Sequence, residues 1–301
     1  MKANLRSTVL VISALVPLTG WTQNASAPPN TRIIVGILDD AREEMVNWKP
    51  GVAQNRIVRP AFEKTPLGWK PVDETPLPAS MKWTVAFDGR SLGSVETEAG
   101  AEGFTRIYKI TTPTAKIPSV GQPSQQFSGI MGNGETKFRR PLVVVSRPNY
   151  GDPDGWKRTK LPDRIAAMIR EAFRRQYPHV DRCKEEEIME RDWKFPDSAL
   201  SFPFAYASNK DSFLAEVDID SGDCGWIDQP DQPESGPWFF VSADGKVKWV
   251  GSFLSLLDAG DYDSDGRSEF VFFLSQGENT DGFVLFDAKF ENQISLLWHY
   301  H

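Results

Sequence analysis

The sequence predicts an α+β protein that is mainly β, with antiparallel hairpins and one clear amphipathic helix, at about residues 162–177. Apolar runs joined by tight turns recur along the chain, and only that one segment has a helical apolar period. The 22 prolines and 23 glycines among 301 residues argue against a helical bundle. A complete β-propeller is an alternative that the spacing disfavours, because the hairpins do not recur every 40–50 residues or so.

The first 27 residues have the layout of a secretory signal peptide. Lys2 and Arg6 precede the apolar run 9–18, and Ala25-Ser26-Ala27 supplies small residues for a cut after Ala27. We therefore expect a secreted or periplasmic protein. Pro28 is unfavourable directly after a cut, so a shifted cut or an uncleaved anchor stays open. We expect no transmembrane span after the signal.

Residues 28–160 are predicted to be a β-rich region with proline-rich loops. Residues 32–38 and 141–146 are apolar runs typical of buried strands, and 106–110 alternates like a half-buried strand. Residues 83–95 predict two strands around an Asp-Gly turn. The proline-rich stretches 60–80 and 113–124 are expected to be loops.

Residues 161–194 are predicted to be a helical segment. From 162 to 177 the apolar residues fall on one helix face, and Pro162 and Pro178 suit the start and the stop of the helix. Its arginines lie off that face, where they are either solvated or an anion-binding patch: Arg164, Arg170, Arg174 and Arg175. Residues 183–193 are interpreted as a second short helix.

Residues 195–301 are predicted to be a β region, although 28–301 could equally form one domain. Residues 238–250 predict another hairpin around Asp-Gly, and 283–298 predict a third. Tryptophans such as Trp83, Trp238 and Trp249 are expected to fill the core, the alternative being a sugar-binding platform.

One loop carries clear chemistry, at Asp261, Asp263 and Asp265. These alternating carboxylates precede Gly266, which permits a sharp bend, and an apolar strand follows from residue 270. The Arg267 carbonyl and the Glu269 carboxylate can add further oxygens. Such hard ligands suit Ca²⁺ better than Zn²⁺. An acidic turn without an ion is the alternative.

The spacing in residues 258–274 resembles the calcium loop of FG-GAP and VCBS-type repeats, which lies in β-hairpins. An EF-hand fits poorly because Glu is absent from the twelfth position. The resemblance implies calcium ligands at Asp261, Asp263, Asp265, Glu269 and the Arg267 carbonyl, with a structural role. It covers one loop, and it implies no activity.

Cys183 and Cys224 are the only cysteines. In an oxidising compartment they are expected to form one disulfide, which would close a loop of about 42 residues. Two buried free thiols are the alternative.

The net charge of −7 argues against a nucleic-acid partner. The chain contains no H-E-x-x-H, P-loop or G-x-G-x-x-G motif. We therefore predict a secreted or periplasmic interaction protein with an unknown protein or carbohydrate ligand and a structural calcium ion. The alternative is a secreted glycosidase-like hydrolase, whose two catalytic acids the sequence does not single out among 41.

Overall fold

The structure is a computed structural model that describes residues 32–40, 56–72, 76–102, 106–112, 117, 141–185, 187–222, 236–276 and 280–299. It is mainly β, with antiparallel sheets and one α-helix, as the sequence predicts. The predicted signal peptide and the greater part of the predicted loop 113–124 lie outside the described residues. In the described part of the chain, no helix is long and apolar enough to cross a membrane.

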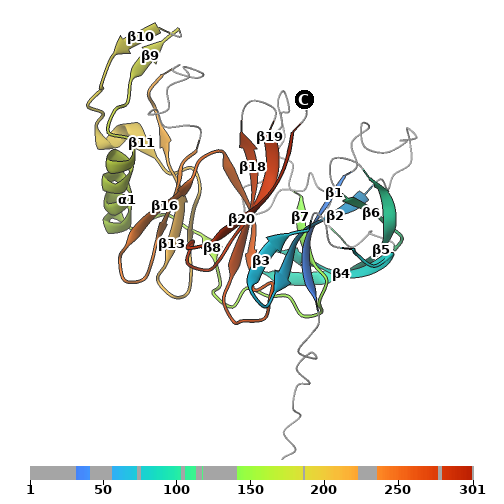
Figure 1. Cartoon of the computed structure of the whole chain (residues 1–301). Coiled ribbons are helices and arrows are strands. Elements are labelled where there is room, and N and C mark those ends of the chain that lie inside the picture. Colours follow the sequence, from blue (N-terminus) through green and yellow to red (C-terminus); the bar gives the residue numbers. More distant parts are fainter. Residues whose placement is uncertain are drawn as a thin grey trace, which may run out of the picture. The chain divides into compact units, whose positions relative to one another are not determined.

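Six of the first seven strands close into a barrel (Figure 1). Its strands are β1 (Ile33–Asp40), β2 (Arg56–Thr65), β4 (Ser80–Phe87), β5 (Arg90–Glu102), β6 (Arg106–Ile110) and β7 (Leu142–Val145). The order is β1-β7-β4-β5-β6-β2, and β1 also pairs with β2, which closes the ring. The short strand β3 (Gly68–Pro71) extends β2.

Two further sheets follow. The five-stranded sheet has the order β16-β15-β13-β12-β8, and the four-stranded sheet runs β17-β18-β19-β20. Their strands are β8 (Lys157–Arg158), β12 (Ala205–Ala207), β13 (Phe213–Glu216), β15 (Trp238–Val241), β16 (Val247–Gly251), β17 (Leu254–Gly260), β18 (Glu269–Gln276), β19 (Thr280–Phe286) and β20 (Gln293–His299). The helix α1 (Asp163–Gln176) packs against β15 and β16. No propeller is formed by the residues that the structure describes.

The continuous apolar runs are explained by strands that are buried on both faces. In β1, Ile34 and Leu38 belong to the core inside the barrel, whereas Val35 and Ile37 pack against the four-stranded sheet. The same alternation recurs in β7, β15 and β18. Four apolar cores therefore lie inside the barrel, between barrel and four-stranded sheet, between the two sheets, and under α1.

Two local predictions are wrong. Residues 60–80 are not a loop, because β2 and β3 occupy much of this stretch. Pro60 fits into β2 where the β1–β2 register shifts between Val35 and Gly36. At such a bulge a residue without an N–H is tolerated.

Residues 183–193 form no helix. The structure has a hairpin there instead, made of β9 (Arg182–Lys184) and β10 (Glu187–Glu190). Glu185 lies in the turn with a φ of 51°, a left-handed conformation that ends any helical path. The remaining short elements are the 3-10 helix η2 (Asp197–Ala199) and the paired strands β11 (Leu200–Ser201) and β14 (Asp218–Ile219).

Candidate cation site

The aspartate loop connects β17 to β18, at the end where Gly260 pairs with Glu269. Within it, Ser264 and Gly266 have φ values of 70° and 82°. Gly266 adopts this left-handed conformation at little cost because it lacks a Cβ. The loop therefore folds back tightly and brings its acidic side chains together.

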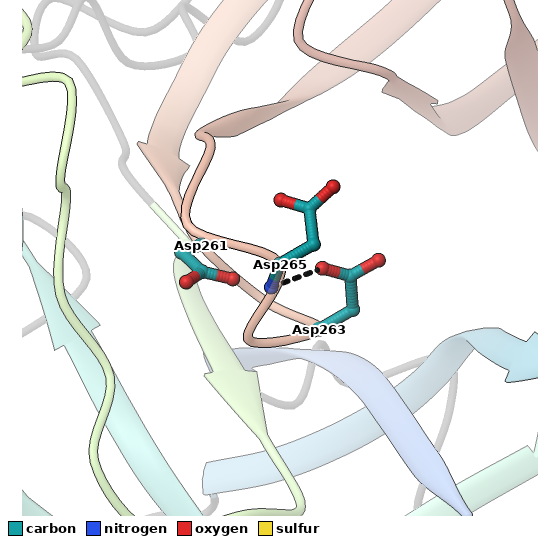
Figure 2. A group of neighbouring side chains, drawn as sticks. All are labelled: Asp261, Asp263 and Asp265. Carbon is teal, nitrogen blue, oxygen red and sulfur yellow. Dashed lines mark hydrogen bonds between the residues drawn. The ribbon is translucent and has the colours of Figure 1, made fainter.

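Each aspartate accepts hydrogen bonds from amides further along the loop. Asp261 accepts from the amides of Ser264 (2.5 Å) and Gly266 (3.1 Å). Asp263 accepts from the amide of Asp265 at 3.1 Å, which is the dashed line in Figure 2. Asp265 in turn accepts from the amide of Arg267 at 2.9 Å. These bonds fix the carboxylates before any ligand arrives.

The three aspartates offer one oxygen each within 4.8 Å of one another. Figure 2 shows the three side chains on the turn. Among the described residues they are the only group of three or more carboxylates, histidines or cysteines placed closely enough to hold a metal ion. The arrangement can therefore bind a metal ion, although the carboxylates alone do not select one metal.

Glu269, the fourth predicted carboxylate, is buried at the start of β18. It accepts a hydrogen bond from the amide of Tyr262 at 2.9 Å. Burial, and then the negative charges of the three aspartates, raise its pKa to about 8. A bound cation would oppose both effects by stabilising the ionised form.

Arg267 is exposed, and its guanidinium pairs with Asp265, with Nη2 at 2.7 Å from Oδ2. Its predicted role was that of a carbonyl ligand, and this role stays a prediction. A metal ion would therefore have to share the carboxylate of Asp265 with this guanidinium.

Two residues from distant parts of the chain hold the loop. Lys64 of β2 forms an ion pair with Asp263. Arg147, which follows β7, donates from Nε to the Tyr262 carbonyl at 2.8 Å and from Nη2 to the Asp261 carbonyl. Both anchors were missed by sequence reasoning, since no local pattern marks either residue.

A second acidic turn, at residues 152–155, contacts Ser268 at the end of the aspartate loop. Asp152 accepts from the amides of Gly155 (2.9 Å) and Trp156 (2.6 Å) and from the Ser268 hydroxyl (2.5 Å). Burial raises the pKa of Asp152. Asp154 accepts from the amide of Ser268 at 3.0 Å and pairs with Lys210 at 2.5 Å. The Asp-Pro-Asp-Gly sequence was the signal that could have revealed this turn.

Behind the loop lies a buried cluster of one acid and two tyrosines. Asp258 accepts from the hydroxyls of Tyr150 and Tyr262, and the two rings stack with centroids 5.7 Å apart. Burial, and then the charge of Asp258, raise the pKa of both tyrosines well above the ordinary value. This cluster fixes the segment after β7 on β17.

The cysteine prediction reaches the edge of the described chain. Cys183 is buried, and its amide donates to the Ser221 carbonyl at 3.0 Å. It also forms an isolated parallel bridge with Gly222. Cys224 lies outside the described residues. The disulfide stays a prediction, with the chain that leads to Cys224 running beside Cys183.

Trp83 and Trp238 are fully buried, as predicted, whereas Trp249 is 43% exposed.

Comparison with known proteins gives no match: no protein-family model fits the chain, and no curated protein or solved structure is significantly similar to it.

Proposed function

We propose that this chain is an exported, β-rich interaction protein in which a calcium ion fastens the β17–β18 loop. The observation that carries the proposal is the convergence of three carboxylates on a loop that Lys64 ties to the barrel. All the proposed ligands lie within residues 261–269, so the ion is expected to act by holding this one loop in its folded conformation.

Calcium is proposed because every candidate ligand is a hard oxygen. Ca²⁺ takes six to eight such ligands in a flexible geometry, whereas structural Zn²⁺ prefers nitrogen and sulfur. The ligands would be Asp261, Asp263, Asp265, the Arg267 carbonyl and Glu269, with water completing the shell. The FG-GAP/VCBS-like spacing supports the same choice.

The ion would share its carboxylates with cationic side chains that are already present. Lys64 contacts Asp263, Arg267 contacts Asp265, and Arg147 lies 3.6 Å from Asp261. Calcium affinity is therefore expected to depend on these residues as well as on the ligands.

Export is part of the proposal and is supported by the sequence alone. Residues 1–27 have the pattern of a signal peptide, and in an oxidising compartment Cys183 and Cys224 would form the proposed disulfide. An interaction role is proposed in preference to catalysis. No arrangement among the described residues specifically favours the hydrolase alternative.

The test is thermal unfolding of the purified protein, expressed from the full-length chain, with millimolar calcium and then with chelator. A calcium concentration of about 100 times the dissociation constant adds roughly 2.7 kcal/mol, which raises the Tm by about 5–10 °C. Asp261→Ala should remove this rise.

Asp287→Ala is the matched control. Asp287 also accepts several amide hydrogen bonds in a hairpin turn, between β19 and β20, but it is not part of the acidic group. This variant should keep the full calcium response. Identical melting of the unaltered protein in calcium and in chelator would refute the proposed site.

A further inference from the structure

Three arginines lie over three aromatic rings beside the helix α1. Arg170 lies 5.3 Å from the ring centroid of Phe202, Arg174 lies 5.1 Å from that of Phe195, and Arg182 lies 5.1 Å from that of Trp193. We call Arg170, Arg174 and Arg182 the arginine row.

The rings form a firm base for these guanidinium groups. Trp193, Phe195 and Phe202 all pack against the core under α1. Phe195 also contacts Phe173 of that core, with ring centroids 5.9 Å apart. A guanidinium held over an anchored ring loses little further freedom when it binds an anion.

The chain that carries the row is basic, whereas residues 183–202, which supply the three rings, contain three lysines and arginines and six aspartates and glutamates. Residues 157–182 contain eight lysines and arginines and three aspartates and glutamates, in a chain of net charge −7. Such a segregated basic region attracts anionic partners. Stacking of the three arginines on the rings would not by itself require further basic residues to cluster beside them.

The row already holds one carboxylate. Asp197 of η2, which is exposed, pairs with Arg174 at 2.5 Å. The hydrogen bond from Arg174, together with the charges of Arg174 and Arg170, lowers the pKa of Asp197. The pair shows which chemical group this surface stabilises.

Donors remain on either side of that pair. The Nε atom of Arg170 is buried and makes no hydrogen bond within the part of the chain that the structure describes. Arg182 contacts the ring of Trp193, and no hydrogen bond from its guanidinium to a described residue is found. The guanidinium of Arg182, at an exposed position, therefore has capacity for further acceptors, and Arg170 would have to use its terminal nitrogens because its Nε is buried.

We propose that the arginine row docks an extended acidic segment of a partner protein, with carboxylates on alternate residues. Arg170 and Arg174 are four residues apart on α1, so their Cβ atoms are about 5–6 Å apart. Alternate side chains on one face of an extended peptide are about 6.6 Å apart. Arg170 and Arg182 can each receive one carboxylate. At Arg174 a partner carboxylate would share the guanidinium with Asp197 or displace it. The inference names a partner class for the proposed interaction role, and it does not require the calcium site.

The probe is a fluorescent peptide of four Glu-Ser repeats, and the readout is anisotropy during titration with the full-length protein. The double variant Arg170→Gln/Arg182→Gln should bind the peptide at least about tenfold more weakly, because hydrogen bonds to charged groups are strong. The peptide with Gln in place of Glu should not bind.

The control variant is Arg164→Gln/Arg175→Gln. It removes the same charge from exposed positions of the same helix, and neither residue stacks on a ring within the described part of the chain. Because salt screens exposed charges, this variant should change the affinity for the peptide by less than about twofold. Arg170→Lys/Arg182→Lys keeps the charge without the planar fork and should bind with intermediate affinity. Circular dichroism and thermal melting establish that each variant is folded.

Equal weakening by the row and control variants would overturn the proposal in favour of unspecific attraction. Absence of peptide binding would also overturn it, including the case in which a sulfated polysaccharide or an anionic vesicle binds instead. Each titration is run in calcium and in chelator. Peptide binding in both conditions without calcium binding would leave the arginine row standing and refute only the cation site.

Discussion

Lys64 and Asp263 form an ion pair across 199 residues of sequence. Lys64 belongs to β2 of the barrel, and Asp263 to the loop that carries the candidate cation site. The pair joins the site to the barrel and places a positive charge beside Asp263, one of the proposed ligands.

Replacing Lys64 should strengthen calcium binding. In Lys64→Met the ammonium no longer repels the ion, so we expect an affinity gain of about 3- to 10-fold, together with a loss of about 0.5–1 kcal/mol of stability in chelator. Lys70→Met is the control, because Lys70 is a nearby lysine that pairs with Glu63. Calcium titration and urea unfolding measure both effects. An unchanged affinity in Lys64→Met would show that this residue does not act on the ion.

Gly260 should not tolerate a side chain. A Cβ there would lie 2.2 Å from the hydroxyl of Tyr150, whose ring is buried and bound to Asp258. Overpacking typically costs 1–3 kcal/mol, so Gly260→Ala should destabilise the protein by about 2 kcal/mol. Gly151→Ala, where a Cβ meets nothing within 4 Å, should cost less than about 0.5 kcal/mol. Similar unfolding midpoints for the two variants in urea would contradict this packing.

Glu216 should make stability fall as the pH rises. Burial, followed by the charge of Asp218, raises its pKa from 4.5 to about 7. Between these two values the folded protein retains a proton that the unfolded chain releases, so folding is progressively penalised towards neutral pH. Glu216→Gln removes this penalty and should be more stable than the unaltered protein at pH 8, by on the order of 2 kcal/mol, with little difference near pH 4.

Urea unfolding at several pH values measures this dependence. Glu187→Gln, at an exposed position of β10, is the control and should follow the unaltered protein throughout. A Glu216→Gln curve parallel to that of the unaltered protein would contradict the assignment.

The Cys183–Cys224 disulfide should be present and stabilising. The hydrogen bond from Cys183 to Ser221 brings the chain three residues before Cys224 beside its partner. Mass spectrometry of a non-reduced digest should find the linked peptides. Cys183→Ser/Cys224→Ser should lose about 3–4 kcal/mol by the chain-entropy estimate. Two free thiols in the exported protein would refute the bridge.

The elements that the sequence predicted correctly are those with strong local patterns. The apolar periodicity of α1 and the Asp-Gly turns at Gly89 and Gly245 place the helix and two hairpins nearly where the structure has them. The closure of the barrel depends on pairing between β1 and β2, which local patterns do not encode. The interpretation of residues 183–193 as a short helix rested on no such strong pattern, and strand pairing between Cys183 and Ile188 prevails there.

The candidate site likewise has one part that could be predicted from the sequence and one part that could not. Its aspartates lie within one loop, so their spacing was readable. Lys64, Arg147 and the Asp152 turn reach the loop only through the tertiary fold. Their contribution could not be predicted from residue types, because lysines, arginines and aspartates are common on every surface.

The most direct measurement for the proposed site is isothermal titration of the metal-stripped protein with calcium chloride. One calcium ion should bind per chain, and magnesium at the same concentration should compete poorly, since Mg²⁺ demands a tighter octahedral shell. Asp261→Ala should abolish the heat of binding, and Asp287→Ala should retain it. Absence of calcium binding by the unaltered protein, or undiminished binding by Asp261→Ala, would contradict the account.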